Sequence, residues 1–321
     1  MSILGVDIGG TKTAVGVVTE DGKILESTVF PTCADRGFEV SREAVRKAIA
    51  FGVQMGESRG GISAIGICAP GPLDPRRGVM LNPPNMPGWR NIPLADEVSR
   101  EFGVPCSVEK DTNGAVLAEY LYGAAQGCQH ALYLTISTGI GAALLWNGQV
   151  YHGRNGVGME AGHLTIDYRS PIANASGVRG SIEALASGLG IARRVSELLP
   201  DYPGSCLKLP ATAAAVGEAI QQGDELALRI FEEIAEMLAA WLGSLVSLFD
   251  PDVVVIGGGV SQIGDPLFSR LREQVPGRSI NPFAKETPIV PAILGPEVGI
   301  VGAAAVAQRR AEQANRVALR D

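Results

Sequence analysis

Apolar residues recur along the chain in two successive sets that follow the same order. The first set opens with three short runs typical of β-strands, at 3–6, 14–18 and 24–30. Apolar residues at helical spacing then fill 40–55, and 62–68 is a continuous apolar run that predicts a buried strand. The first set therefore predicts an α/β arrangement that begins with strand, glycine turn and strand.

The second set repeats this opening farther along the chain. Strands are predicted at 131–136 and 142–146 around a second glycine turn, and 253–256 is a run of Val and Ile typical of a strand covered on both faces. Further helices are predicted at 115–122, 183–199, 225–249 and 302–319, and the Pro- and Asn-rich stretch 81–93 is predicted to be an ordered loop. Two units with one topology indicate two α/β domains with a cleft between them.

Composition narrows the class of protein. Apolar residues make up 46% of the 321 residues and charged residues 19%, as in soluble globular proteins. No apolar run approaches the roughly 18 to 20 residues that span a bilayer. The net charge is −7 and Lys and Arg form no block, so neither a membrane nor nucleic acid is expected as a partner. Five scattered cysteines and an N-terminus without a signal-peptide pattern favour a cytoplasmic protein that acts on a small molecule.

Three glycine-rich turns stand at the ends of predicted strands. The first is Gly9-Gly10, whose backbone amides can approach an anion closely, and Thr11 and Lys12 add a hydroxyl and a charge there. A single turn of this kind is usually an ordinary hairpin. The second and third turns are Thr138-Gly139-Ile140-Gly141 and Gly257-Gly258-Gly259, the latter predicted to open a helix. Three such turns in these positions indicate phosphate binding.

The order and spacing of these turns resemble the ROK family (repressors, open reading frames and kinases) of the actin-like, hexokinase-like ATPase superfamily, over nearly the whole chain. The resemblance implies two ribonuclease-H-like domains with an interdomain cleft: a smaller one at 1–117 plus 301–321 and a larger one at 118–300. It further implies that ATP and Mg²⁺ are held by three groups of residues: Asp7, Gly9, Gly10, Thr11 and Lys12; Thr138, Gly139 and Gly141; and Gly257, Gly258 and Gly259.

Asp111 stands at the end of a strand and just before a helix, where an Asp is often only a cap. In the family the matching carboxylate is the catalytic base, and a sugar hydroxyl needs such a proton acceptor to attack the γ-phosphate of ATP. The family usually has Asn before this Asp, whereas this chain has Lys110. A cation there would lower the pKa of the carboxyl group, or the lysine would point to solvent.

Four further residues match the sugar-contacting positions of the family. Asn85 lies in the stretch "NPPNMPGW", whose Trp89 is predicted to be a core residue, and the other three are Glu160, His163 and Glu183. Taken alone, Glu160 and His163 would be an ordinary exposed pair. Their position between the second glycine turn and Glu183 favours a sugar-binding role, and Lys110 is included among the residues that contact the substrate.

Many family members hold a zinc ion through a His and three cysteines in C-x-C-G-x-x-G-C-x-E. In "NASGVRGSIE" the glycines match at Gly177 and Gly180 and the Glu at Glu183, but the cysteine positions are Asn174, Ser176 and Ser181. Hydroxyl and amide groups replace thiolates poorly at Zn²⁺. We therefore predict no structural zinc, and expect these side chains to bond to the backbone or to His163.

The sequence thus predicts a cytoplasmic, homodimeric, ATP- and Mg²⁺-dependent sugar kinase acting on the 6-hydroxyl of glucose or a close hexose. The alternatives within the enzyme class are kinases of N-acetylmannosamine, N-acetylglucosamine, allose or fructose. A sugar-responsive repressor would need a DNA-binding helix-turn-helix ahead of Asp7, where the chain leaves no room for one. A non-catalytic sugar sensor is disfavoured by Asp111 and slightly favoured by Lys110.

Overall fold

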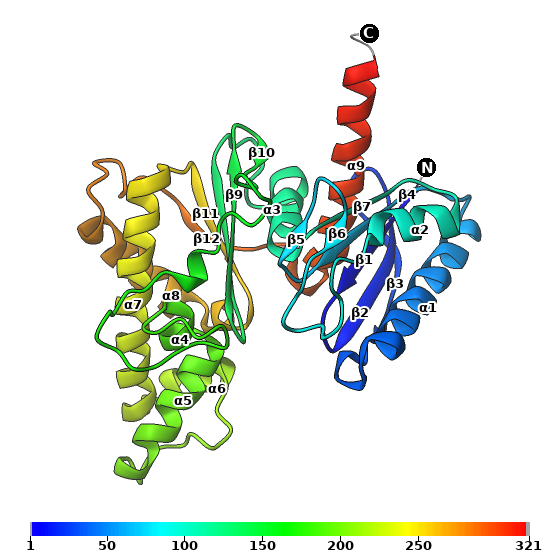
Figure 1. Cartoon of the computed structure of the whole chain (residues 1–321). Coiled ribbons are helices and arrows are strands. Elements are labelled where there is room, and N and C mark those ends of the chain that lie inside the picture. The colour runs from blue at the N-terminus through cyan, green and yellow to red at the C-terminus, as the bar shows by residue number, and fades with distance from the viewer. Residues whose placement is uncertain (1, 319–321) are drawn as a thin grey trace. The chain divides into compact units, whose positions relative to one another are not determined.

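The computed structural model describes residues 2–318, with side chains as far as residue 314. These residues form two compact units (Figure 1). Unit 1 comprises residues up to Gly127, Val150–Met159 and the C-terminal part from Ile293, and unit 2 comprises Cys128–Gln149 and Glu160–Ala292. Residues 319–321 of the predicted smaller domain, and the predicted helix end at Leu319, lie outside the described part.

The sheets of the two units have the same strand order and direction. In unit 1 the order is β3-β2-β1-β4-β7, with β3 antiparallel to β2, β2 antiparallel to β1, and β4 and β7 parallel to β1. Their bounds are Ser2–Ile8 (β1), Lys12–Val18 (β2), Ile24–Pro31 (β3), Ile62–Ala69 (β4) and Cys106–Lys110 (β7). In unit 2 the order β10-β9-β8-β11-β12 repeats this pattern, with β8 in the place of β1. The bounds there are Ala131–Ile136 (β8), Ile140–Trp146 (β9), Gln149–Val150 (β10), Val253–Gly257 (β11) and Ile289–Pro291 (β12). Each unit is ribonuclease-H-like, as predicted.

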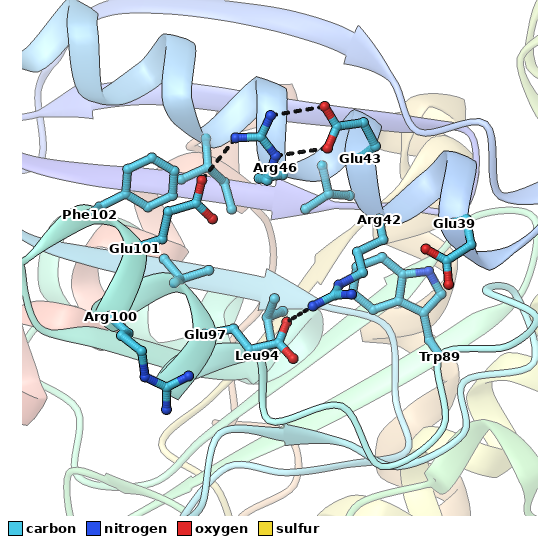
Figure 2. A pocket seen from close by; sticks show the side chains of 13 residues that line it. Glu39, Arg42, Glu43, Arg46, Trp89, Leu94, Glu97, Arg100, Glu101 and Phe102 are labelled. Carbon is cyan, nitrogen blue, oxygen red and sulfur yellow. Dashed lines mark hydrogen bonds and ion pairs between the residues drawn. The ribbon is translucent and has the colours of Figure 1, made fainter.

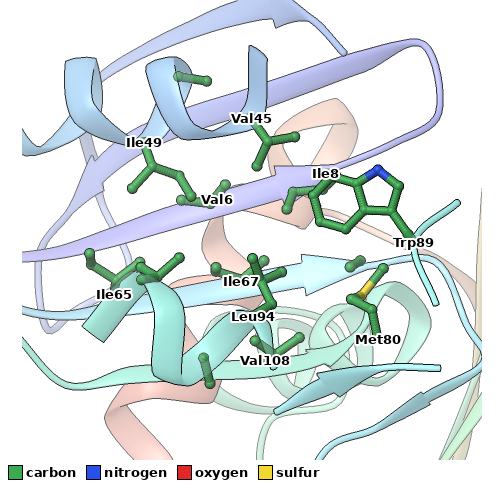
Figure 3. Packing of buried hydrophobic residues seen from close by; sticks show 14 of the residues in the cluster. Val6, Ile8, Val45, Ile49, Ile65, Ile67, Met80, Trp89, Leu94 and Val108 are labelled. Atoms are coloured by element: carbon green, nitrogen blue, oxygen red, sulfur yellow. The ribbon is translucent and has the colours of Figure 1, made fainter. Parts of the chain in front are cut away.

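One face of the unit 1 sheet packs against α1 (Phe38–Glu57) and α2 (Leu94–Phe102). Because side chains alternate along a strand, Leu4, Val6 and Ile8 of β1 all enter this core. Figure 3 shows Val6 and Ile8 among side chains of α1, α2, β4 and β7. Trp89 is 1% exposed in this core, as predicted, and its indole N–H donates to the Ser41 hydroxyl over 2.8 Å.

The opposite face of the sheet packs against α9 (Val298–Ala318), and α3 (Asp111–Tyr122) packs on α9 in turn. Glycines allow this approach: a Cβ on Gly5 would collide with the carbonyl oxygen of Ile300, and one on Gly66 with that of Ala303. The contact between α3 and α9 also explains why unit 1 extends to Gly127, beyond the predicted boundary at 117.

Helices of unit 2 are α4 (Ile182–Ala186), α5 (Gly188–Leu198), α6 (Ala213–Gln221), α7 (Glu225–Phe249) and α8 (Asp265–Gln274). The predicted helix at 183–199 is therefore two helices, since Ser187 has an extended backbone and caps α5 by accepting from the Gly190 N–H. The glycine run does not open an α-helix as predicted. It leads into a 3₁₀-helix, Gly259–Ile263, and the α-helix begins only at Asp265. Within residues 2–318, no helix combines the length and the apolar character needed to cross a membrane.

The close approach of α9 yields a test of the packing. Gly66→Ala should lower the free energy of unfolding by about 1–3 kcal/mol or more, because backbone atoms of α9 must shift to admit the methyl group. Urea denaturation followed by circular dichroism measures the loss. The control is Gly204→Ala, since no atom lies within 4 Å of the added Cβ at that exposed position. Equal stability of the two variants would contradict this account of the α9 contact.

Candidate active site

The first glycine turn joins β1 to β2 and lies against the predicted sugar loop. Gly9 N–H donates to the Lys12 carbonyl over 2.8 Å, which closes the turn. A Cβ on Gly10 would lie 2.7 Å from the carbonyl oxygen of Asn85, so glycine is needed for this contact. Thr11 and the start of β2 at Lys12 are exposed. The structure thus brings the predicted phosphate turn and Asn85 together within unit 1.

Asp7 lies near the end of β1 on the face covered by α9. Its carboxylate packs against Gly299 in the first turn of α9, where a Cβ would overlap it. Burial first and the negative charge of Asp111 second raise the pKa of Asp7 to about 6, against the opposing effect of Lys12. Asp7, Lys12 and Asp111 are therefore close enough to interact electrostatically.

Asp111 is the first residue of α3, directly after β7, as predicted. Its Oδ1 accepts from the Thr112 N–H over 2.7 Å, so part of the carboxylate caps its own helix. Lys110 is only 8% exposed, which removes the alternative that this side chain points to solvent. Its aliphatic stem passes Gly71, with Cδ 3.9 Å from the place of a Cβ there.

Unit 2 contains Glu183 and the other two glycine turns, 138–141 and 257–259. Glu183 Oε2 accepts from the Ile140 N–H over 2.9 Å, and a Cβ on Gly139 would lie 2.5 Å from the same oxygen. Gly257 pairs with Thr135 at the end of β8. Gly258 has φ 90°, and a Cβ there would lie 2.5 Å from the Ile136 carbonyl oxygen. The turn that includes Thr138 and Gly141 and the run that ends at Gly259 therefore meet at the carboxyl ends of β8 and β11.

Glu160 and His163 lie beside each other, with 3.8 Å between Glu160 Oε2 and His163 Nε2. The Asn174 amide nitrogen donates to His163 Nδ1 over 2.6 Å. Asn174 Oδ1 accepts from the backbone N–H groups of Ser176 and Val178, over 3.1 and 3.0 Å, and these bonds fix which way the amide faces. Asn174 thus bonds to the backbone and to His163, as the sequence analysis expects, and thereby orients the imidazole.

A second position of the zinc pattern, Ser181, bonds to the backbone. Ser181 is fully buried, donates to the Val178 carbonyl over 3.3 Å and accepts from the Ala184 N–H over 3.2 Å as the cap of α4. The groups at the positions of the zinc pattern are therefore an amide, which bonds to His163, and hydroxyls, where zinc needs thiolates. These donors do not fit a zinc ion. Over residues 2–318, no three His, Cys, Asp or Glu side chains group as a metal cage.

A separate groove lies in unit 1 between α1 and α2 and contains none of the predicted site residues. Figure 2 shows it crossed by ion pairs, from Arg42 to Glu97 and from Arg46 to Glu43 and Glu101. These side chains are partly exposed and satisfy one another, so each pair contributes little to stability. The groove is a charged surface between two helices and plays no part in the candidate site.

The raised pKa of Asp7 predicts a pH-dependent cost in stability. Well below pH 3.8, the ordinary pKa, the group is protonated in both the folded and unfolded states, and the cost develops as the pH rises from there to about 6. As the pH rises through 6, the folded state must bear a buried charge that costs at most about 3 kcal/mol. Asp7→Asn removes that charge, so the free energy of unfolding of the variant minus that of the parent should grow by roughly 1 kcal/mol between pH 5 and 8. Urea denaturation at several pH values measures it, and a difference that does not change with pH would contradict the assignment.

The ROK family matches residues 3–310. A glucokinase from Thermotoga maritima is 36% identical over 316 residues, which cover 97% of this chain and 98% of that protein. Crystal structures of a ROK hexokinase from Thermus thermophilus (36% identity, 98% and 100% of the two chains, TM-score 0.82) and of a ROK family glucokinase from Streptomyces griseus in complex with glucose and AMPPNP (34% identity, 96% and 100%, TM-score 0.81) have the same fold. The chain belongs to the ROK family.

Proposed function

We propose that this protein is an ATP-dependent sugar kinase that transfers the γ-phosphoryl group of ATP to the 6-hydroxyl of glucose. The observation that carries the proposal is the position of Asp111 at the start of α3, within electrostatic reach of Asp7 beside the Gly9-Gly10 turn. A proton acceptor next to a phosphate-binding turn is the minimum that phosphoryl transfer to an alcohol requires. The glucokinase and hexokinase relatives support this choice of reaction.

In the proposed mechanism Asp111 accepts the proton of the sugar hydroxyl as its oxygen attacks the γ-phosphorus. The backbone amides of Gly10 and Thr11, with the Lys12 ammonium, would hold phosphate oxygens, and the Gly9 N–H would keep the turn closed through its bond to the Lys12 carbonyl. Because Asp111 is anchored through its Oδ1 to the Thr112 N–H, little motion is needed to keep the base in place. Unit 1 therefore supplies the base and one phosphate-binding turn.

Unit 2 would contribute the remaining contacts. Glu160 and Glu183 offer carboxylate acceptors for sugar hydroxyls, His163 offers the N–H of Nε2, and Asn85 of unit 1 adds an amide. The Thr138–Gly141 turn would bind phosphate, and Gly257, Gly258 and Gly259 would adjoin the ribose and adenine of ATP. A Cβ on Gly139 or on Gly258 would lie 2.5 Å from Glu183 Oε2 or from the Ile136 carbonyl oxygen, which leaves no room for a larger side chain at either position.

Mg²⁺ is proposed to enter with ATP. It would neutralise charge on the phosphoryl group during transfer. The oxygen donors of Asp7 and Asp111 suit this hard cation, which commonly binds through substrate phosphates and only one or two carboxylates. The raised pKa of Asp7 fits the same role, because a buried carboxylate beside a second negative charge is stabilised by a bound cation.

Glucose is proposed over N-acetylmannosamine, N-acetylglucosamine, allose and fructose because a glucokinase relative is 36% identical, against 29% for an N-acetylmannosamine kinase that also spans nearly the whole chain. Lys110 stands beside the base where the family has Asn, and its burial keeps the side chain close to that region. A panel of these sugars, assayed by coupled ADP release, ranks the candidates. A cytoplasmic location and a homodimeric state remain predictions from the sequence.

Asp111→Asn should reduce kcat for glucose by at least about 100-fold, since the amide cannot accept the proton, with glucose affinity nearly unchanged. The control is Asp265→Asn, which alters another Asp that is the first residue of a helix. Turnover of Asp111→Asn within a few-fold of the parent would remove Asp111 from the role of base. Lack of phosphorylation of every sugar in the panel by the parent itself would favour the non-catalytic sensor.

The loop that contains Asn174 and Ser181 should hold no structural zinc, because its side chains already bond to the backbone and to His163. Dialysis against EDTA followed by restored Mg²⁺ should leave the activity unchanged, and elemental analysis should find less than about 0.1 zinc per chain. One tightly held zinc per chain, lost together with activity, would overturn this prediction.

A further inference from the structure

Segment Val150–Met159 belongs to unit 1, although the residues before and after it along the chain belong to unit 2. Its ends are joined by a hydrogen bond from the Gly158 N–H to the His152 carbonyl, over 2.9 Å. The segment lies against the hairpin formed by β5 (Leu73–Asp74) and β6 (Val79–Met80), where a Cβ on Gly156 would lie 2.7 Å from Pro75. This closed loop holds His152 in a fixed position within unit 1.

The His152 side chain reaches a buried carboxylate of β7. Its Nε2 lies 2.7 Å from Oε2 of Glu109, which is 4% exposed. Because an ionised carboxylate can only accept, Nε2–H donates to Glu109. A buried carboxylate needs hydrogen-bond donors in place of water. Among the hydrogen bonds described for Glu109, the donor to Oε2 is His152.

The other oxygen of Glu109 bonds to residues on both sides of Asp111. Oε1 accepts from the Lys110 backbone N–H and from the Asn113 side-chain amide, each over 2.9 Å. Lys110 is the N-cap of α3, and its own side chain makes no capping bond. Glu109 therefore fixes the start of α3, where backbone N–H groups lack partners within the helix. Asp111 lies in the chain between Lys110 and Asn113, the two residues that bond to Glu109 Oε1.

We propose that His152 is a positioning residue that acts through Glu109 to orient the carboxylate of Asp111. This inference rests on the proposed function, in which Asp111 is the base. Without the His152 donor, Glu109 retains a buried oxygen that lacks its partner, and the carboxylate turns toward water or another donor. The bonds to Lys110 and Asn113 then weaken, and the first turn of α3 loosens around the base. Binding of glucose and ATP does not depend on this bond, so the effect falls on kcat.

The test compares His152→Leu, which cannot donate, with His152→Gln, whose amide can. His152→Leu should lower kcat by about 10- to 100-fold with KM for glucose and ATP within about threefold, as expected for losing a hydrogen bond to a buried charge. His152→Gln should restore kcat to within about fivefold of the parent. His130→Leu, at a histidine of unit 2 outside the predicted site, should behave as the parent. His152→Ser, too short to reach Glu109, replaces the leucine variant if that fails to fold.

A second measurement is independent of catalysis. Hydrogen–deuterium exchange of the free protein should show faster exchange across residues 109–116 in His152→Leu than in the parent or in His152→Gln. If the parent phosphorylates no sugar, the proposed function fails while the exchange data still decide whether His152 orders the start of α3. Parental kcat together with parental exchange in His152→Leu would overturn the inference. So would a loss of kcat in His152→Gln as large as that in His152→Leu.

Discussion

The contact of α9 with the sheet of unit 1 determines the environment of Asp7. Gly5 and Gly66 present no side chain on that face, so the backbone of α9 lies directly on β1 and β4. The first turn of α9, at Gly299, then covers the carboxylate of Asp7 and excludes water from it. The raised pKa of Asp7 follows from this covering first and from the charge of Asp111 second. A packing feature of the sheet thereby sets the electrostatics of the candidate site.

The repeated topology explains why the chemistry of each unit gathers at strand ends. In both sheets a glycine turn follows the central strand, β1 or β8, and a parallel neighbour ends at the same edge. Parallel strands place their carboxyl ends together, so residues from distant parts of the sequence meet there without long loops. In unit 2 this brings Gly258 against the end of β8. In unit 1 it puts Asp111, directly after β7, in electrostatic reach of Asp7 on β1.

Elements with strong periodicity could be predicted from the sequence, and those with weak or composite patterns could not. Helix α7 was predicted with the observed bounds, Glu225–Phe249, because its apolar stripe is long and Asp224 provides an N-cap. Helix α2 was missed because it has only nine residues and directly follows the Pro- and Asn-rich stretch 81–93, so its apolar positions are too few to show a helical period. The helical apolar pattern at 183–199 is continuous, so it did not indicate the break at Ser187. This residue is the N-cap of a second helix.

The residues of the candidate site also divide into those that local sequence patterns predict and those that they do not. Asp111, the glycine turns and Glu183 lie in local patterns, and the structure places each turn where the strands end. The bond between His152 and Glu109 spans 43 residues and has no local signature, and Gly299 matters only because Asp7 packs on it. Sequence periodicity reports which face a residue occupies, whereas such contacts depend on how distant segments pack.

The loop around His163 is ordered by hydrogen bonds although it has no thiolates at the cysteine positions of the zinc pattern. Asn174 accepts two backbone N–H bonds and donates to the imidazole, so it both shapes the turn and selects the tautomer of His163. With Nδ1 occupied as an acceptor, the ring proton lies on Nε2, the atom that faces Glu160. A zinc ligand in this place would polarise the imidazole strongly, whereas an amide leaves it a neutral hydrogen-bonding group. The hydrogen-bonded loop therefore presents an N–H donor beside a carboxylate, a combination that suits a hydroxyl acting at once as acceptor and donor, as the proposed sugar contact requires.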